Sequence, residues 1–287
     1  MRPERIASRI FLDGGNPEET KEIIETLGFL DGQTTNPTLI SKNPGVREHL
    51  EGGGKFTAEE LLDYYRDVVK KISAIIPEGS ISVEVYADGA SKADQMLSQG
   101  RVMFGWIPNA HIKFPTTAEG LKAASLAVKE GMRVNMTLCF TQSQAAAVYG
   151  ATKGARKGDV FVSPFVGRLD DRGENGMDLI VNTLRMYEKG DGHVEVLTAS
   201  VRTMDHLLYA LKIGSPIITS PFEIVKEWGR KGMPMPGPDF SYDGQGLKAI
   251  PYENLDLGKA WQEYDIRHEL TEKGMERFSK DWNSLIR

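Results

Sequence analysis

Short apolar segments and amphipathic segments alternate eight times along the chain, and this alternation limits the folds that the chain can adopt. The apolar segments are typical of β-strands, and the segments between them have the periodicity of helices. The predicted strands cover residues 9–13, 31–40, 80–86, 109–114, 133–140, 159–167, 195–200 and 216–220. Helices are expected after all of them, and residues 41–56, which contain four glycines, are expected to form a loop. Such alternation indicates a parallel sheet.

Eight strand–helix units in 287 residues close most economically into a (β/α)8 TIM barrel. The alternative is an open, doubly wound sheet, which usually carries a G-x-G-x-x-G motif after its first strand. Here the first strand is followed by Gly14, Gly15 and Asn16, which do not have that spacing. We therefore predict an α/β barrel over residues 1–232. Residues 233–287 begin with a proline-rich stretch and should form a C-terminal extension whose helix, residues 270–287, packs on the barrel.

Composition excludes several classes of protein. The net charge of −5 argues against a nucleic-acid groove, and the single Cys139 excludes an intramolecular disulfide and a cysteine-rich zinc site. No segment approaches the roughly 18 apolar residues of a membrane helix, and residues 1–9 do not resemble a signal peptide. A cytoplasmic protein without nucleic-acid or membrane partners is expected, and formation of a homo-oligomer is left open.

Polar residues occupy every second position in several predicted strands, opposite a wholly aliphatic face. In a barrel the aliphatic face packs against the outer helices, so the polar face points inward, towards the C-terminal mouth where barrel active sites lie. Asn36 lies at the end of the second strand. The inward positions are Asp13, Glu84, Lys113, Asn135, Thr137, Ser163 and Ser200. So many inward polar groups from different strands are unlike a structural core.

Lys113 stands among Ile112, Phe114 and Pro115, where an ammonium group is poorly solvated. A lysine in such surroundings can attack a carbonyl carbon and form a Schiff base, although a single lysine at a strand end is more often a surface residue. It is the only lysine in these strands, so it is the candidate nucleophile.

The remaining polar residues can be assigned to steps of the same chemistry. Glu84 and Thr137 are suited to hold the water that relays protons, and Asp13 is suited to be the base that starts carbon–carbon cleavage. Donors for sugar hydroxyls are Asn36, Asn135 and Ser163, and candidates for phosphate binding are Ser200 and the two arginines that follow strands, Arg168 and Arg202. Each arginine alone is equally consistent with a surface salt bridge.

Several motifs, in order along the chain, resemble those of the transaldolases, which are class I Schiff-base enzymes on a (β/α)8 barrel. They are Thr34-Thr-Asn-Pro-Thr-Leu-Ile40, His111-Ile-Lys-Phe-Pro-Thr-Thr-Ala-Glu-Gly120, Asn135-Met-Thr-Leu-Cys-Phe140, Ser163-Pro-Phe-Val-Gly-Arg168 and Ala199-Ser-Val-Arg-Thr203. The resemblance runs from about residue 10 to residue 232. Two departures are the Gly-Gly pair after Asp13 and the unmatched tail from Met233.

The resemblance implies an activity and a role for each residue. Lys113 would bind a dihydroxyacetone unit as a Schiff base, Asp13 and Glu84 would be the acid/base pair, and Thr137 would help Glu84 to hold water. Contacts to the donor sugar and its phosphate would come from Asn36, Asn135, Ser163, Arg168, Ser200 and Arg202. The unit would pass from sedoheptulose 7-phosphate to glyceraldehyde 3-phosphate in the non-oxidative pentose phosphate pathway. No metal or organic cofactor is implied.

Two other functions remain as alternatives. Fructose 6-phosphate aldolases resemble this chain but typically have Gln and Tyr where it has Glu84 and Phe165, so these two residues favour transfer over simple cleavage. The other alternative is a sugar-phosphate-binding barrel without covalent chemistry. Retention of Lys113, Asp13 and Glu84 together argues against it.

Overall fold

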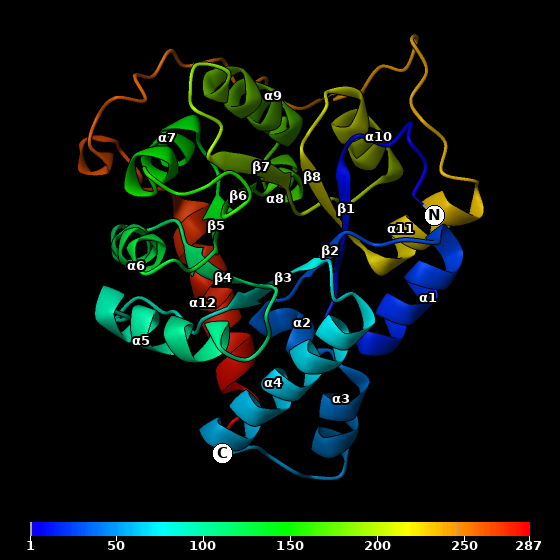
Figure 1. Ribbon diagram of the computed structural model, residues 1–287, viewed down its shortest axis with the longest axis vertical. Coiled ribbons are helices and arrows are strands. Elements are labelled where there is room, and N and C mark those ends of the chain that lie inside the picture. The colour runs from blue at the N-terminus through cyan, green and yellow to red at the C-terminus, as the bar shows by residue number, and fades with distance from the viewer. Residues whose placement is uncertain (1, 245) are drawn as a thin grey trace.

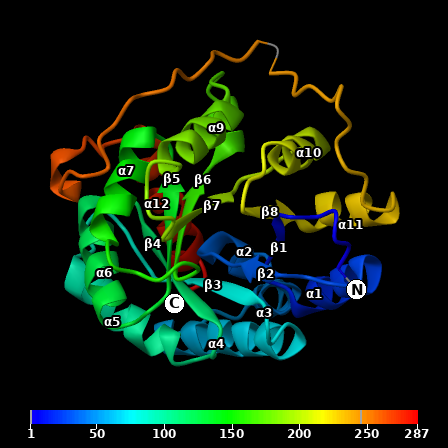
Figure 2. The same ribbon diagram turned by 45° about the horizontal axis from the view of Figure 1, so that its top comes forward.

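The computed structural model describes residues 2–244 and 246–287, and eight parallel strands in sequence order form a closed barrel at its centre (Figures 1 and 2). This confirms the predicted (β/α)8 architecture. The strands are β1 (Arg9–Asp13), β2 (Gly32–Thr34), β3 (Ser80–Glu84), β4 (Ala110–Pro115), β5 (Val134–Cys139), β6 (Val160–Pro164), β7 (Val194–Thr198) and β8 (Ile217–Pro221).

Helices surround the barrel, as Figure 2 shows. They are α1 (Pro17–Leu27), α2 (Pro37–Ser41), α3 (Pro44–Glu51), α4 (Ala58–Ile75), α5 (Ala93–Phe104), α6 (Ala118–Lys129), α7 (Gln142–Ala151), α8 (Val166–Asp170), α9 (Gly176–Tyr187), α10 (Met204–Lys212), α11 (Phe222–Arg230) and α12 (Glu269–Asn283). None of the helices in the described ranges is long and apolar enough to cross a membrane.

The alternation along β4 separates its two faces as predicted. Ile112 and Phe114 point outward, and a Cβ atom added to Gly100 of α5 would lie 3.2 Å and 3.0 Å from them. Lys113 points inward, with Glu84 of β3 opposite it on one side and Asn135 of β5 on the other. The register of the barrel therefore brings these three polar side chains together at one level.

Three predictions of local structure were wrong. The strand expected at residues 31–40 ends at Thr34, and helix α2 follows it. The loop expected at residues 41–56 contains helix α3. Each of these helices begins with an asparagine cap and a proline: the Asn36 side chain accepts from the Leu39 N–H, and that of Asn43 accepts from the Gly45 N–H. At α3 this start signal outweighs the glycines of the predicted loop. The strand expected at residues 159–167 likewise ends at Pro164, and α8 follows it.

Among the described residues between α11 and α12 there is little regular structure, apart from a short 3-10 helix at Trp261–Glu263. Helix α12 then crosses one end of the barrel (Figure 1) and packs on α2 and β5. The hydroxyl of Thr271 in α12 donates to the Leu138 carbonyl (3.0 Å), and Asp281, also in α12, accepts a hydrogen bond from Thr38. The helix is therefore held across the ends of the strands that carry the predicted site.

Candidate active site

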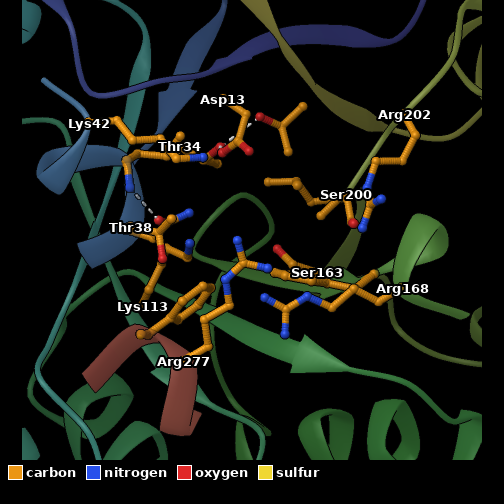
Figure 3. Close-up of a pocket in the computed structure, with 17 residues that line it drawn as sticks. Asp13, Thr34, Thr38, Lys42, Lys113, Ser163, Arg168, Ser200, Arg202 and Arg277 are labelled. Atoms are coloured by element: carbon orange, nitrogen blue, oxygen red, sulfur yellow. Dashed lines mark hydrogen bonds between the residues drawn. The ribbon is translucent and has the colours of Figure 1, made fainter. Parts of the chain in front are cut away.

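A pocket of about 290 Å³ opens at the C-terminal ends of the strands, beside α12 (Figure 3). Its wall is strongly polar and carries four cationic side chains besides Lys113. The lining residues are Asp13, Thr34, Asn36, Thr38, Leu39, Lys42, Lys113, Ser163, Phe165, Arg168, Leu197, Ala199, Ser200, Arg202, Thr219, Arg277 and Phe278. The pocket is therefore suited to an anionic ligand that carries hydroxyl groups.

Lys113 and Glu84 form a buried ion pair at the base of the pocket. The Lys113 Nζ lies 2.8 Å from Glu84 Oε2, and the two side chains are only 4% and 5% exposed. The same Nζ donates to the Thr35 carbonyl at 3.0 Å. Burial raises the pKa of Glu84 above its usual value, and the nearby Lys113 charge opposes this shift. A carboxylate with a raised pKa is a stronger base, so Glu84 is suited to take a proton from the lysine.

Asp13 approaches the pocket from the end of β1. Its Oδ1 accepts a hydrogen bond from the Thr34 hydroxyl at 2.6 Å, and that hydroxyl lies 2.7 Å from the Thr219 hydroxyl. Burial raises the pKa of Asp13, while Lys113 and Thr34 act in the opposite direction. The carboxyl group is thus oriented by a threonine and is a better proton acceptor than an exposed aspartate.

A layer of buried polar side chains lies around Lys113. Asn135 donates to the Ser82 hydroxyl (3.0 Å) and accepts from the Ser163 hydroxyl (2.6 Å), which fixes the orientation of its amide. Ser163 also lines the pocket, whereas Asn135 is fully buried behind it. Thr137 is fully buried too, and within residues 2–244 and 246–287 its hydroxyl has no hydrogen-bond partner. A buried hydroxyl of this kind is suited to hold a water molecule.

The opposite end of the pocket is positively charged. Arg168 is half-buried, and its Cζ lies 5.6 Å from the ring centre of Phe165 and 5.4 Å from that of Phe278. Burial lowers its pKa, and the positive charges of Arg277 and Arg202 lower it further. An anion bound among these three arginines would relieve their mutual repulsion.

The loop after β7 is held in a strained conformation. Ser200 has φ = 58°, in the left-handed region that side chains other than glycine rarely adopt. Gly167 passes so close to it that an added Cβ would lie 2.6 Å from the Ser200 carbonyl oxygen and 2.3 Å from Cγ of Arg202. The backbone N–H of Arg202 also donates to Nδ1 of the buried His206 at 3.2 Å. These contacts fix where Ser200 and Arg202 present their donors, and such strain often accompanies a functional site.

Most of the predicted site residues meet at this pocket. Eight of them line it: Asp13, Asn36, Lys113, Ser163, Phe165, Arg168, Ser200 and Arg202. Glu84 lies directly behind Lys113, and Asn135 and Thr137 lie in the buried layer. The Asn36 amide oxygen caps α2, so its NH2 group is the part left for a ligand. In the described part of the chain, no three His, Cys, Asp or Glu side chains are grouped so that they could hold a metal ion.

Comparison with known proteins agrees with this geometry. Residues 10–287 match the family described as Transaldolase/Fructose-6-phosphate aldolase. The chain belongs to this family. A "Probable transaldolase" of Dehalococcoides mccartyi is 35% identical over 277 residues, which cover 96% of this chain and 99% of that protein. A "Probable transaldolase" of Alkaliphilus metalliredigens is 33% identical over 279 residues, covering 97% of this chain and 100% of that protein.

A solved structure of 3-hexulose-6-phosphate synthase from Salmonella typhimurium is also similar in shape, at 11% identity and a TM-score of 0.47. It covers 79% of this chain and 99% of that chain. This likeness is too distant to bear on activity. Membership of the transaldolase/aldolase family makes the chain an enzyme of the transaldolase type.

Several pocket residues of this family member were not predicted as site residues. Thr34 belongs to the first transaldolase-like motif, and its position beside Asp13 follows from the pairing of β1 with β2. Thr38 lies on α2, in a segment predicted as strand, and Lys42 follows α2, in a segment predicted as loop. Phe278 lies in the C-terminal helix, which was predicted only to pack on the barrel, and the position of Arg277 follows from no spacing in the sequence. Only the path of α12 across the barrel brings Arg277 to the pocket (Figure 3).

Proposed function

We propose that this protein is a transaldolase that transfers a dihydroxyacetone unit between phosphorylated sugars through a Schiff base on Lys113. The observation that carries the proposal is the buried Lys113–Glu84 pair, with a 2.8 Å separation, at the base of a pocket whose other end holds arginines. Such a site offers a nucleophilic amine, a nearby base and an anion-binding end in one cavity. The proposed donor and acceptor are sedoheptulose 7-phosphate and glyceraldehyde 3-phosphate.

The first step is imine formation. Glu84 takes a proton from Lys113, and the free amine attacks the C2 carbonyl carbon of the ketose. The carbinolamine then loses its hydroxyl group as water and becomes an iminium ion, with Glu84 and a water held at Thr137 moving the protons. Thr137 has an unpartnered buried hydroxyl among the described residues, which suits this role.

The second step breaks the C3–C4 bond. Asp13 takes the proton of the C4 hydroxyl, an aldehyde forms at C4, and the bonding electrons move into the iminium group to give an enamine on Lys113. The short aldose phosphate leaves and another aldehyde phosphate enters. The enamine carbon attacks that aldehyde, Asp13 returns its proton, and hydrolysis of the new iminium releases the product ketose. The raised pKa of Asp13 makes its carboxylate a better acceptor for the proton of the C4 hydroxyl.

The alternative activity is cleavage of fructose 6-phosphate with release of free dihydroxyacetone. Release requires a proton on the enamine carbon before the next aldehyde arrives. Phe165 lines the pocket and packs against Phe140, with ring centres 5.8 Å apart, so it presents no hydroxyl to the intermediate. A tyrosine at this position could orient water or pass a proton. Phe165 is therefore the observation that favours transfer.

The test compares the two reactions in one preparation. Fructose 6-phosphate with erythrose 4-phosphate should give sedoheptulose 7-phosphate quickly, whereas fructose 6-phosphate alone should give dihydroxyacetone much more slowly. Phe165→Tyr should raise the slow reaction relative to the fast one. A wild-type enzyme that releases dihydroxyacetone as fast as it transfers it would instead be an aldolase.

A further inference from the structure

The C-terminal helix α12 contributes a charged side chain to the pocket. Arg277 lines the pocket together with Arg168 and Arg202, and Figure 3 shows its guanidinium directed into the same cavity as the other two. The three arginines come from distant parts of the chain: α8, the loop after β7, and α12. A surface arginine without a ligand would have no reason to be directed at two like charges, because each charge destabilises the others.

The acidic partners of these arginines leave their charge incompletely balanced. Arg202 pairs with Asp171 at 3.0 Å, and both side chains are largely exposed. Arg277 lies 3.9 Å from Asp281, one turn along α12, but Asp281 also accepts a hydrogen bond from Thr38. Among the ion pairs of the described residues, none involves Arg168. An anion in the pocket is the partner that this cluster lacks.

Helix α12 packs closely on the barrel, and this packing holds the backbone of Arg277 at the edge of the pocket. Gly274 packs so closely that an added Cβ would lie 2.6 Å from Cδ2 of Leu138 and 2.9 Å from Nη1 of Arg168. Phe278, next to Arg277, is buried and lies against the Arg168 guanidinium. The residues that follow α12 are held in place as well, because Phe56 exchanges backbone hydrogen bonds with Leu285 and Arg287 (3.0 Å and 2.9 Å).

We infer that Arg277 is a third arginine of the substrate-phosphate site, so that the C-terminal helix itself selects sugars with a terminal phosphate. The inference rests on the proposed function, and on the sequence-based prediction that Arg168, Ser200 and Arg202 bind the phosphate. Three guanidinium groups from three elements can surround a phosphate dianion, which has enough acceptor oxygens for all of them. The site would then be complete only when α12 is seated on the barrel.

The test measures binding of inorganic phosphate to the full-length protein by isothermal titration calorimetry. Arg277→Gln should weaken phosphate binding about tenfold, because it removes one charge-assisted contact. Lys280→Gln is the matched control: it removes one positive charge from an exposed position on the same helix, outside the pocket. It should leave phosphate affinity within about twofold of the wild type, since long-range charge effects are screened.

A kinetic measurement separates contact with phosphate from a structural role of the helix. For fructose 6-phosphate, Arg277→Gln should raise KM about tenfold with a smaller change in kcat, and Arg277→Lys should recover part of the loss. Equal phosphate affinity in the wild type and Arg277→Gln would overturn the inference, as would an equal loss in Lys280→Gln. A wild-type protein that binds no phosphate would instead refute the phosphate site on which the proposed function depends.

Discussion

The Glu84→Gln substitution removes one charge and almost no volume from the base of the pocket. It leaves the Lys113 ammonium buried beside a neutral amide, with the Thr35 carbonyl as its other acceptor. Breaking a buried ion pair by removing one partner costs about 3–5 kcal/mol, because the other charge stays desolvated. Both side chains here are at most 5% exposed, so little solvent screening reduces this figure. We therefore expect Glu84→Gln to lower the free energy of unfolding by about 3–5 kcal/mol at pH 7.

Removing the other partner should cost less. In Lys113→Met the remaining Glu84 can take a proton and become neutral, because burial already raises its pKa above 4.5. The sign of the pH dependence follows from this shift. The unfolded state loses the Glu84 proton first as the pH rises, so the stability of Lys113→Met falls above about pH 4.5 until the folded-state pKa is passed. Below about pH 4.5 this loss of stability disappears, because Glu84 is protonated in both the folded and the unfolded state.

Urea unfolding followed by circular dichroism measures these quantities for the wild type, both single variants and the double variant. The double variant should be more stable than Glu84→Gln, because it no longer contains the buried ammonium that Glu84→Gln leaves without its carboxylate, and the cycle should show strong coupling. A cost below about 1 kcal/mol for Glu84→Gln, with no coupling to Lys113, would refute the reasoning, because the two groups would then not form a charged pair.

Three further predictions concern phosphate binding and the role of Asp13. Arg168→Ala and Arg202→Ala should each weaken the binding of phosphorylated substrates by about 1.5–3 kcal/mol, or ten- to a hundredfold, and change the binding of unphosphorylated dihydroxyacetone little. An equal increase in KM for both kinds of substrate would contradict the phosphate assignment. Asp13 must be ionised to act as a base, and burial raises its pKa. The acidic limb of the pH profile of kcat should therefore lie above pH 3.8, the usual pKa of an aspartate. Asp13→Asn should lose cleavage of fructose 6-phosphate yet still allow dihydroxyacetone to be trapped on the enzyme, and cleavage at the wild-type rate would exclude this role.

The barrel could be predicted because its determinants are local. Apolar residues mark each strand in the sequence, and the polar residues at alternate positions identify its inward face. Lys113, Glu84 and Asn135 could be grouped in advance because parallel strands in register place their inward residues at the same level. Once the strands were aligned, the location of the pocket followed.

The parts that were missed depend on contacts between distant residues or on competing local signals. Helix α2 was missed because its residues were assigned to the preceding strand, and α3 was missed because the glycines of residues 41–56 were weighted above the Asn-Pro pair that starts it. Arg277 was missed because its place depends on the route of the chain after α11, which has no periodicity. The left-handed Ser200 depends on the packing of Gly167 against its carbonyl, which no sequence pattern reveals.

The most direct measurement is borohydride reduction of the enzyme in the presence of fructose 6-phosphate, followed by peptide mass mapping. Reduction fixes any Schiff base as a stable secondary amine and identifies the lysine that formed it. The proposed mechanism predicts one added dihydroxyacetone-derived group, on Lys113 and on no other lysine, and no addition in Lys113→Met, which should also lose turnover. Modification of another lysine, or normal turnover by Lys113→Met, would contradict the mechanism.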